Sequence, residues 1–166
     1  MILRGPRLVL RPLRADDADR VAAIAAEPEV ARWWGLLTAA ELRAKAAGGE
    51  GVEALAVELG GEVIGMLQVA EEADPTYRHA GIDMFLSAGA QGRGLGREAL
   101  TLVCEHLFDQ RRHHRITIDP AADNQRAIRC YTAVGFRTVG TMRLYERGRD
   151  GSFHDGVLME LIREDQ

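Results

Sequence analysis

Cysteine is scarce in this chain, which has only Cys104 and Cys130, and this excludes a disulfide framework. Both fall in segments expected to be helical, where we interpret them as buried thiols. No apolar run is long enough to cross a bilayer. The N-terminus also lacks the continuous apolar segment of a signal peptide, because Arg4, Arg7 and Arg11 interrupt it. The sequence therefore predicts a soluble cytoplasmic protein with no membrane partner.

An excess of positive charge is also missing, since the formal net charge is −4. General nucleic-acid binders are usually basic, so we expect no nucleic-acid partner. The acidic balance suits a cationic substrate, but it equally serves solubility. Neither the cysteines nor the histidines have the spacing of a metal site, so no metal is expected. With 166 residues, 46% hydrophobic and 28% charged, the chain is predicted to form one globular domain over residues 1–166.

The distribution of apolar residues predicts seven strands and four helices in the order βααβββαβαββ. Strands are expected at 7–13, 52–59, 62–70, 79–87, 115–118, 136–145 and 157–162. Helices are expected at 17–26, 38–47, 95–107 and 124–134. The polar stretch from Glu146 to Gly156 is expected to be a loop. We predict an α/β fold with a continuous, twisted mixed sheet of six to seven strands and about four helices on both faces.

Local signals set several boundaries of these elements. Thr38 and Glu41 have the spacing of a capping box. Gly60 and Gly61 supply the positive φ angles of a two-residue hairpin turn. Pro28 is expected to end the first helix.

A glycine-rich segment lies between a predicted strand and an amphipathic helix. Its residues are Gln91, Gly92, Arg93, Gly94, Leu95 and Gly96. Unpaired N–H groups and the helix dipole at such a position favour an anion, and Arg93 and Arg97 add positive charge at the rim. The spacing matches neither the dinucleotide fingerprint nor a Walker loop. The segment alone leaves open an anion cradle or a glycine turn without a ligand.

A second motif follows about thirty residues later. It is N-x-x-A-x-x-x-Y-x-x-x-G-F, made of Asn124, Ala127, Tyr131, Gly135 and Phe136. Together with Q-x-x-G-x-G, it resembles the paired signature of the GCN5-related N-acetyltransferase (GNAT) superfamily. The resemblance covers about Ala80 to Phe136 and implies a GNAT-like fold that binds acetyl-CoA and transfers its acetyl group to an amine.

The resemblance also implies which residues contact acetyl-CoA. They are Met84, Phe85, Leu86, Gln91, Gly92, Arg93, Gly94, Leu95, Gly96, Arg97, Asn124, Ala127 and Tyr131. The strand residues would bind pantetheine through their main chain, beside a splay that separates them from the strand at 115–118. The glycine segment would hold the pyrophosphate. Tyr131 would protonate the leaving thiolate, although a helix aromatic at this position also packs on a sheet.

The reaction needs a neutral amine, so a carboxylate must accept its proton directly or through water. Asp83 lies in the centre of a strand, where aspartate is disfavoured. Asp119 follows the strand at 115–118, and an Asp-Pro pair is also a common turn former. If the two strands are parallel neighbours, both carboxylates face the splay. Mutual proximity and partial desolvation would then raise their pKa values, as a base requires.

One branch of the superfamily is especially similar. The runs at 81–83, 119–120 and 124–131 resemble aminoglycoside 6′-N-acetyltransferases, which implies that Asp83 and Asp119 bind a cationic aminosugar and assist proton transfer. Trp33 and Trp34 also match that branch and suit an acceptor wall, although large aromatics serve equally in cores.

The C-terminal part departs from this branch. The stretch at 150–159 is closer to enzymes that acetylate ribosomal-protein N-termini. Relatives that acetylate siderophore lysine groups share the architecture, and a non-catalytic acyl-CoA-binding module is a further alternative. The acceptor is therefore predicted as a small cationic amine, most specifically the 6′-amine of an aminoglycoside in an antibiotic-resistance enzyme. The sequence does not distinguish a monomer from a homodimer.

Overall fold

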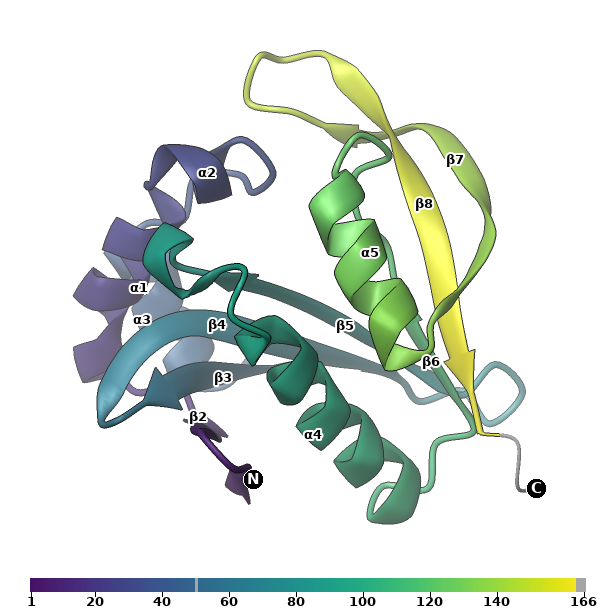
Figure 1. Cartoon of the computed structure of the whole chain (residues 1–166), viewed down its shortest axis with the longest axis horizontal. Coiled ribbons are helices and arrows are strands. Elements are labelled where there is room, and N and C mark those ends of the chain that lie inside the picture. Colours follow the sequence, from purple (N-terminus) through teal and green to yellow (C-terminus); the bar gives the residue numbers. More distant parts are fainter. Residues whose placement is uncertain (50, 164–166) are drawn as a thin grey trace.

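One mixed β-sheet runs through the computed structural model, which describes residues 1–49 and 51–163 (Figure 1). Within these residues its eight strands are β1 (Leu3–Arg4), β2 (Leu8–Pro12), β3 (Val52–Leu59), β4 (Glu62–Glu72), β5 (His79–Leu86), β6 (Arg115–Ile118), β7 (Arg137–Arg147) and β8 (Phe153–Ile162). They lie in the order β1-β2-β3-β4-β5-β6-β8-β7. Strands β5 and β6 are parallel, and the other neighbouring pairs are antiparallel.

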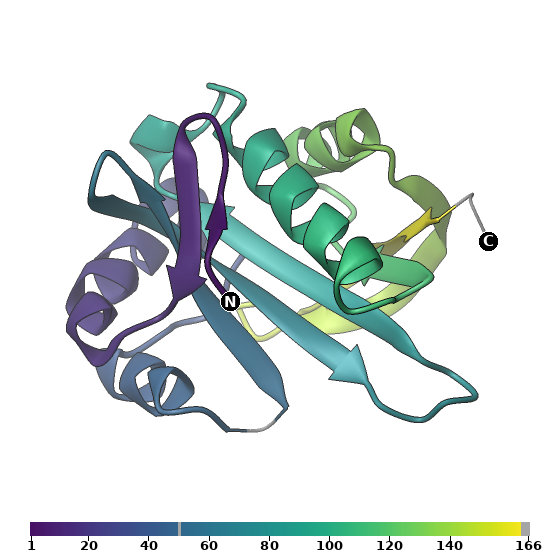
Figure 2. The ribbon, with the colours of Figure 1, turned by 90° about the horizontal axis from the view of Figure 1, so that it is seen from below.

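Helices cover both faces of this sheet. The α-helices in the described residues are α1 (Ala18–Ala25), α2 (Pro28–Ala31), α3 (Ala39–Ala46), α4 (Leu95–Asp109) and α5 (Gln125–Val134). Short 3₁₀ turns, η1 (Ala15–Asp17) and η2 (Ala88–Ala90), precede α1 and follow β5. In Figure 2 the sheet separates α1 and α3 from α4 and α5. None of the helices in this part of the chain has the length and apolar character needed to cross a bilayer.

Two hydrophobic cores form on the two faces of the sheet. Alternate residues of β3 serve different cores, since Leu55 packs with α4 and α5 while Ala56 packs with α1 and α3. A strand buried on both faces is apolar almost throughout, which explains why this part of the sequence is readily identified as strand. Cys104 is buried as expected, in the core that contains α4 and α5, whereas Cys130 is only half-buried.

The predicted mixed sheet with helices on both faces is confirmed, with one strand and one helix more than expected among the described residues. Strand β1 has two residues, too few to produce a periodic pattern. Pro28 follows the end of α1 as predicted, but it also begins α2. Proline is favoured at the first helical position because the missing N–H would have no partner there.

Local turn and cap chemistry agrees with the sequence. The Glu41 N–H donates to Thr38 Oγ1 at 3.2 Å, and the Thr38 N–H donates to Glu41 Oε2 at 2.8 Å, which completes the capping box of α3. Gly60 and Gly61 have φ angles of 58° and 87°, as the β3–β4 hairpin requires.

The prediction of a loop from Glu146 to Gly156 is wrong for both ends of this stretch. Strand β7 extends to Arg147 and β8 begins at Phe153, so only residues 148–152 connect them. The predicted strands at 136–145 and 157–162 are therefore confirmed but too short. The residues that were missed, 146–147 and 153–156, are mostly polar and exposed, so they have no apolar alternation to indicate a strand. Their extended conformation depends on the pairing of β7 with β8.

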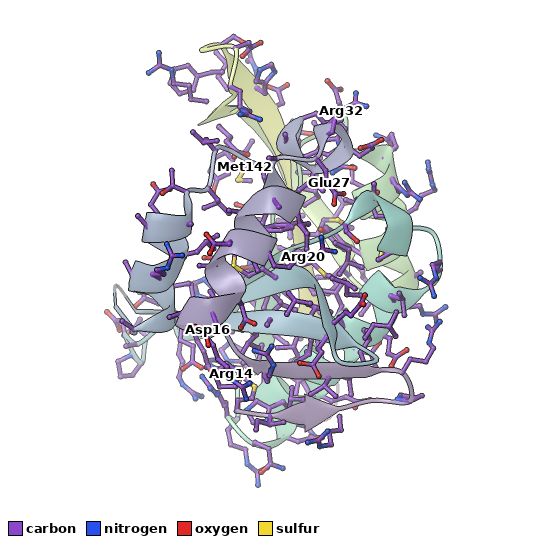
Figure 3. The ribbon with its side chains drawn as sticks, turned by 90° about the vertical axis from the view of Figure 1, so that its left-hand side faces the viewer. Arg14, Asp16, Arg20, Glu27, Arg32 and Met142 are labelled. Carbon is purple, nitrogen blue, oxygen red and sulfur yellow. The ribbon has the colours of Figure 1, made fainter. Side chains whose placement is uncertain are left out.

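Two side chains fix the region of α1 and α2 against the sheet, and Figure 3 shows both. Arg20 Nε donates to the Val63 carbonyl of β4 at 3.1 Å. Glu27, between α1 and α2, accepts the Ala88 N–H of η2 at 2.7 Å. This contact holds α2 and the following tryptophans beside the end of β5.

Candidate active site

A pocket of about 1210 Å³ opens at the end of β5. Figure 1 shows α2 on one side of this region and α5 and the β7–β8 hairpin on the other. The predicted site residues that line the pocket are Trp33, Trp34, Asp83, Met84, Phe85, Leu86, Gln91, Gly92, Gly94, Gly96, Arg97, Asp119, Asn124, Ala127 and Tyr131.

Two predicted residues do not line the pocket. Leu95 is only 1% exposed and belongs to the core beneath α4. Arg93 is exposed, and its carbonyl accepts a hydrogen bond from Arg7 Nη1 at 2.9 Å. Their contribution is to shape the loop rather than to form the pocket wall.

The parallel strands β5 and β6 part within the pocket. They pair only at Ala80 with Ile116 and at Gly81 with Thr117. Beyond Gly81, β5 continues to Leu86 and remains paired with β4 on its other side. The splay between β5 and β6 therefore leaves one main-chain edge of β5 facing the pocket.

Asp83 and Asp119 lie at this splay. Continuing the β5–β6 register by two residues places Asp83 opposite Asp119, on the same face of the sheet. The Asp83 side chain is open to the pocket, yet desolvation by surrounding protein raises its pKa to about 7. The charges of Asp119 and Glu146 act in the same direction, while a hydrogen bond from the Met84 N–H opposes them. A carboxyl with this pKa can accept a proton near neutral pH.

Tyr131 lies in α5 and is buried, with 7% of its surface exposed. Burial raises its pKa well above the ordinary value, and the charges of Asp83 and Asp119 act in the same direction. The phenol is therefore protonated at neutral pH, as a proton donor must be. The ring also packs near Phe136 at a centroid distance of 6.3 Å, so it has a packing role as well.

The glycine segment is built around left-handed backbone conformations. Gly92 and Gly94 have φ angles of 73° and 77°, which glycine adopts without strain. The first hydrogen bond into α4 is donated by the Glu98 N–H to the Gly94 carbonyl. The preceding N–H groups at the helix start have no partner within the helix and can bind an anion.

Side-chain hydrogen bonds hold both ends of the glycine segment. Glu98 accepts hydrogen bonds from the Arg7 N–H at 2.8 Å and from Arg7 Nε at 2.8 Å. Gln91 Nε2 donates to the Leu86 carbonyl at 2.9 Å, and Gln91 Oε1 accepts from Arg126 Nη1 at 3.0 Å. Asn124 caps α5, since its Oδ1 accepts the Ala127 N–H at 3.2 Å.

The two tryptophans have different environments. The guanidinium of Arg32 lies 4.6 Å from the centroid of the Trp33 ring. Trp34 packs edge-on against Phe85 at 4.7 Å and contacts the core beneath α1 and α3. Trp34 therefore combines core packing with a place in the pocket wall.

Sequence reasoning missed several pocket residues. Tyr145, Glu146 and Arg147 come from the end of β7. Tyr145 is the last residue of the predicted strand, whereas Glu146 and Arg147 belong to the stretch that was expected to be a loop. Arg126 comes from the first turn of α5 and adds a cation beside the glycine segment. Arg126 stands two residues after the motif asparagine, which is the one sequence signal that could have identified it.

Curated relatives match different lengths of the chain. Aminoglycoside N(6′)-acetyltransferase type 1 of Klebsiella pneumoniae is 42% identical over 73 residues, which are 43% of this chain and 35% of the relative. The matching segment therefore spans about a third of that relative. Spermidine N(1)-acetyltransferase of Escherichia coli (strain K12) is 24% identical over 156 residues, 90% of this chain and 83% of the relative.

Solved structures share the fold over nearly the whole chain. Ribosomal-protein-S5-alanine acetyltransferase from Vibrio fischeri has a TM-score of 0.84 and 18% identity, covering 99% of this chain and 98% of that one. AAC(6′)-Ib, solved with paromomycin and acetyl-CoA, has a TM-score of 0.78 and 28% identity, with 95% and 94% covered. The model of the acetyltransferase (GNAT) domain matches residues 7–137, well over half of the chain. The protein therefore belongs to the GNAT acetyltransferase family.

Proposed function

We propose that this protein transfers the acetyl group of acetyl-CoA to a primary amine of a cationic small molecule. The observation that carries the proposal is the splay between β5 and β6, where Asp83, Asp119 and Tyr131 line one pocket. A proton acceptor and a proton donor thus lie beside a free main-chain edge. Their presence argues against a module that only binds acyl-CoA.

The donor end of the pocket suits coenzyme A. The N–H groups at the start of α4 suit the pyrophosphate, with Arg97 and Arg126 as nearby cations. The main chain of β5 from Met84 to Leu86 suits the amide groups of pantetheine. Acetyl-CoA bound in this way brings its thioester to the splay, where it supplies an activated acyl group.

Replacing Gly94 with valine is expected to raise the KM for acetyl-CoA. A β-branched residue is strained at a φ of 77°, so the neighbouring N–H groups turn away from the phosphate. Loss of one hydrogen bond to a charged group predicts an increase of roughly ten- to a hundredfold. Initial-rate kinetics at saturating amine measure it.

The matched control for Gly94→Val is Gly89→Ala. A Cβ at Gly89 meets no atom within 4 Å, and its φ is not positive. This variant should keep the wild-type KM. A folded Gly94→Val protein with an unchanged KM would contradict the cradle.

The proposed reaction is direct attack of the neutral amine on the thioester carbonyl. Asp83 accepts the amine proton, directly or through water, because its pKa of about 7 is matched to neutral pH. The new C–N bond forms as the C–S bond breaks. Tyr131 donates its phenolic proton to the leaving thiolate.

For the acceptor, we propose the 6′-amine of an aminoglycoside. Support comes from the carboxylates Asp83 and Asp119, from the aromatic wall of Trp33 and Trp34, and from the 42% identity with an aminoglycoside acetyltransferase. An antibiotic-resistance role follows from this substrate. A polyamine is the alternative favoured by the match to a spermidine acetyltransferase, which covers 90% of this chain. A protein N-terminus is the alternative favoured by the likeness of residues 150–159.

An acetyl-transfer assay with aminoglycosides, a polyamine and a peptide tests the proposal. The assay compares kcat/KM for four kinds of acceptor. These are aminoglycosides with a 6′-amine (kanamycin and tobramycin), their congeners with a 6′-hydroxyl, spermidine, and a peptide with an N-terminal alanine. We expect turnover of the 6′-amines and little turnover of the 6′-hydroxyl congeners. Acetylation of spermidine or the peptide alone would refute the aminoglycoside assignment and retain acetyl transfer. No acetylation of any amine would refute the proposed function.

A further inference from the structure

Strand β7 contains a bulge where it passes the pocket. Met142 pairs with Gly156 and Glu146 pairs with His154, so three residues of β7 lie opposite the single residue Asp155. The middle one, Leu144, has a φ of 49° and an exposed side chain. Its N–H donates to Asp155 Oδ1 at 2.8 Å. A bulge that holds a non-glycine residue in this conformation is typical of a strand that must redirect a neighbouring side chain.

The redirected side chain is Tyr145, which follows Leu144. Its hydroxyl donates to Asp119 Oδ2 at 2.7 Å. The ring lies over Gly156, where a Cβ would come within 3.0 Å of Tyr145 Cδ1. Glycine at position 156 therefore leaves the space that the ring occupies.

The segment carrying Asp119 is attached to the same part of β8. The Val157 N–H donates to the Pro120 carbonyl and the Ala122 N–H donates to the Asp155 carbonyl, both at 2.9 Å. Asp155 thus contacts the bulge through its side chain and the Asp119 loop through its main chain. Asp155 therefore connects the bulge of β7 to the loop that carries Asp119.

We propose that Tyr145 is a positioning residue that fixes the Asp119 carboxylate at the acceptor end of the pocket. The bulge of β7 directs the Tyr145 side chain towards this carboxylate. The inference rests on the proposed function and extends it to a residue with no assigned role. With one carboxylate oxygen bound by the phenol, the other is available to a substrate ammonium. Tyr145 is 51% exposed, so packing alone gives little reason for its placement.

The electrostatics of the phenol agree with this geometry. The hydrogen bond to Asp119 and the charge of Asp119 raise the pKa of Tyr145 to about 12. Desolvation and the charges of Glu146 on β7 and Asp83 on β5 act in the same direction.

A double-mutant cycle in kinetics tests the role. Tyr145→Phe removes the hydroxyl and is expected to raise the KM for the amine roughly tenfold, by loss of a hydrogen bond to a charged group, while the KM for acetyl-CoA is unchanged. If Tyr145 acts through Asp119, adding Tyr145→Phe to Asp119→Asn causes no further loss. Additive losses would overturn the proposal. Tyr77→Phe, an exposed tyrosine outside the pocket lining, is the matched control.

A titration that does not depend on turnover tests the contact itself. Tyrosine Cζ resonances are followed by ¹³C NMR and assigned with Tyr145→Phe. In Asp119→Asn the Tyr145 phenol should ionise at lower pH than in the wild type, towards the ordinary value of about 10. An unchanged titration would overturn the proposal. If no amine is acetylated, the proposed function fails, and this titration alone decides whether Tyr145 binds Asp119.

Discussion

Replacing Asp83 with asparagine is expected to lower kcat/KM for the amine by about a hundred- to ten-thousandfold, the usual contribution of a general base. Asparagine keeps the shape of the side chain and cannot accept the proton. Affinity for acetyl-CoA should be retained, because the glycine segment that suits the pyrophosphate is separate from the splay. Steady-state kinetics measure the first quantity, and calorimetric titration with CoA measures the second.

The pH dependence gives Asp83→Asn a specific signature. In the wild type, kcat/KM should rise as Asp83 loses its proton, with a midpoint near its pKa of about 7. The variant should lack this ascending limb. Asp74→Asn, an exposed carboxylate outside the pocket lining, is the control and should keep both the rate and the limb. A normal profile in Asp83→Asn would remove Asp83 from the mechanism.

Asp83→Asn should lower activity but raise the stability of the folded protein at neutral and higher pH. The folded state raises the pKa of Asp83, so the folded protein holds this proton more tightly than the unfolded chain. The ionised carboxyl therefore costs stability, and this cost grows from about pH 4 and is complete above about pH 7. Asp83→Asn should raise the melting temperature more at about pH 8 than at about pH 5. A lower melting temperature at both would indicate a structural defect instead.

Replacing Tyr131 with phenylalanine is expected to lower kcat by roughly ten- to a thousandfold, around the range for general acids. The change removes one hydroxyl and little volume, so the packing near Phe136 is retained. The KM for acetyl-CoA should change little. Single-turnover measurements with saturating substrates isolate the chemical step.

Tyr145→Phe provides an internal comparison for Tyr131→Phe. Both lose a phenol from the same pocket, but the first is expected to change the KM for the amine and the second kcat. Full activity of Tyr131→Phe would leave this residue with a packing role alone. A loss of CoA affinity in the same variant would point to a disturbed cofactor site.

Much of the fold was predictable because its signals are local. Glycine conformations at the β3–β4 turn, the capping box of α3 and the Asn124 cap of α5 depend on residues a few positions apart. The central strands are buried on both faces, so their apolar character is continuous. The pairing at the splay could not be predicted in the same way. The sequence supported only a conditional statement, that Asp83 and Asp119 face each other if their strands are parallel neighbours.

The C-terminal hairpin was the least predictable part. Arg137–Arg147 is mostly exposed and polar, and its extended form depends on hydrogen bonds to β8. Single-sequence patterns report burial, so the exposed ends of β7 and β8 beside their turn resemble a loop. Neither the bulge at Leu144 nor the hydrogen bond from Tyr145 to Asp119 could be predicted, because both depend on the register between β7 and β8.

The sequence by itself determined the glycine segment, the helix that begins after it, the motif around Tyr131 and hence the family resemblance. These are short-range features, in which neighbouring residues set the backbone conformation. Only the tertiary structure decided that β5 and β6 part after Gly81, that Arg126 reaches Gln91, and that Tyr145 reaches Asp119. The two hydrogen bonds join residues 26 and 35 positions apart in the sequence, and tertiary packing rather than local preference brings these residues together.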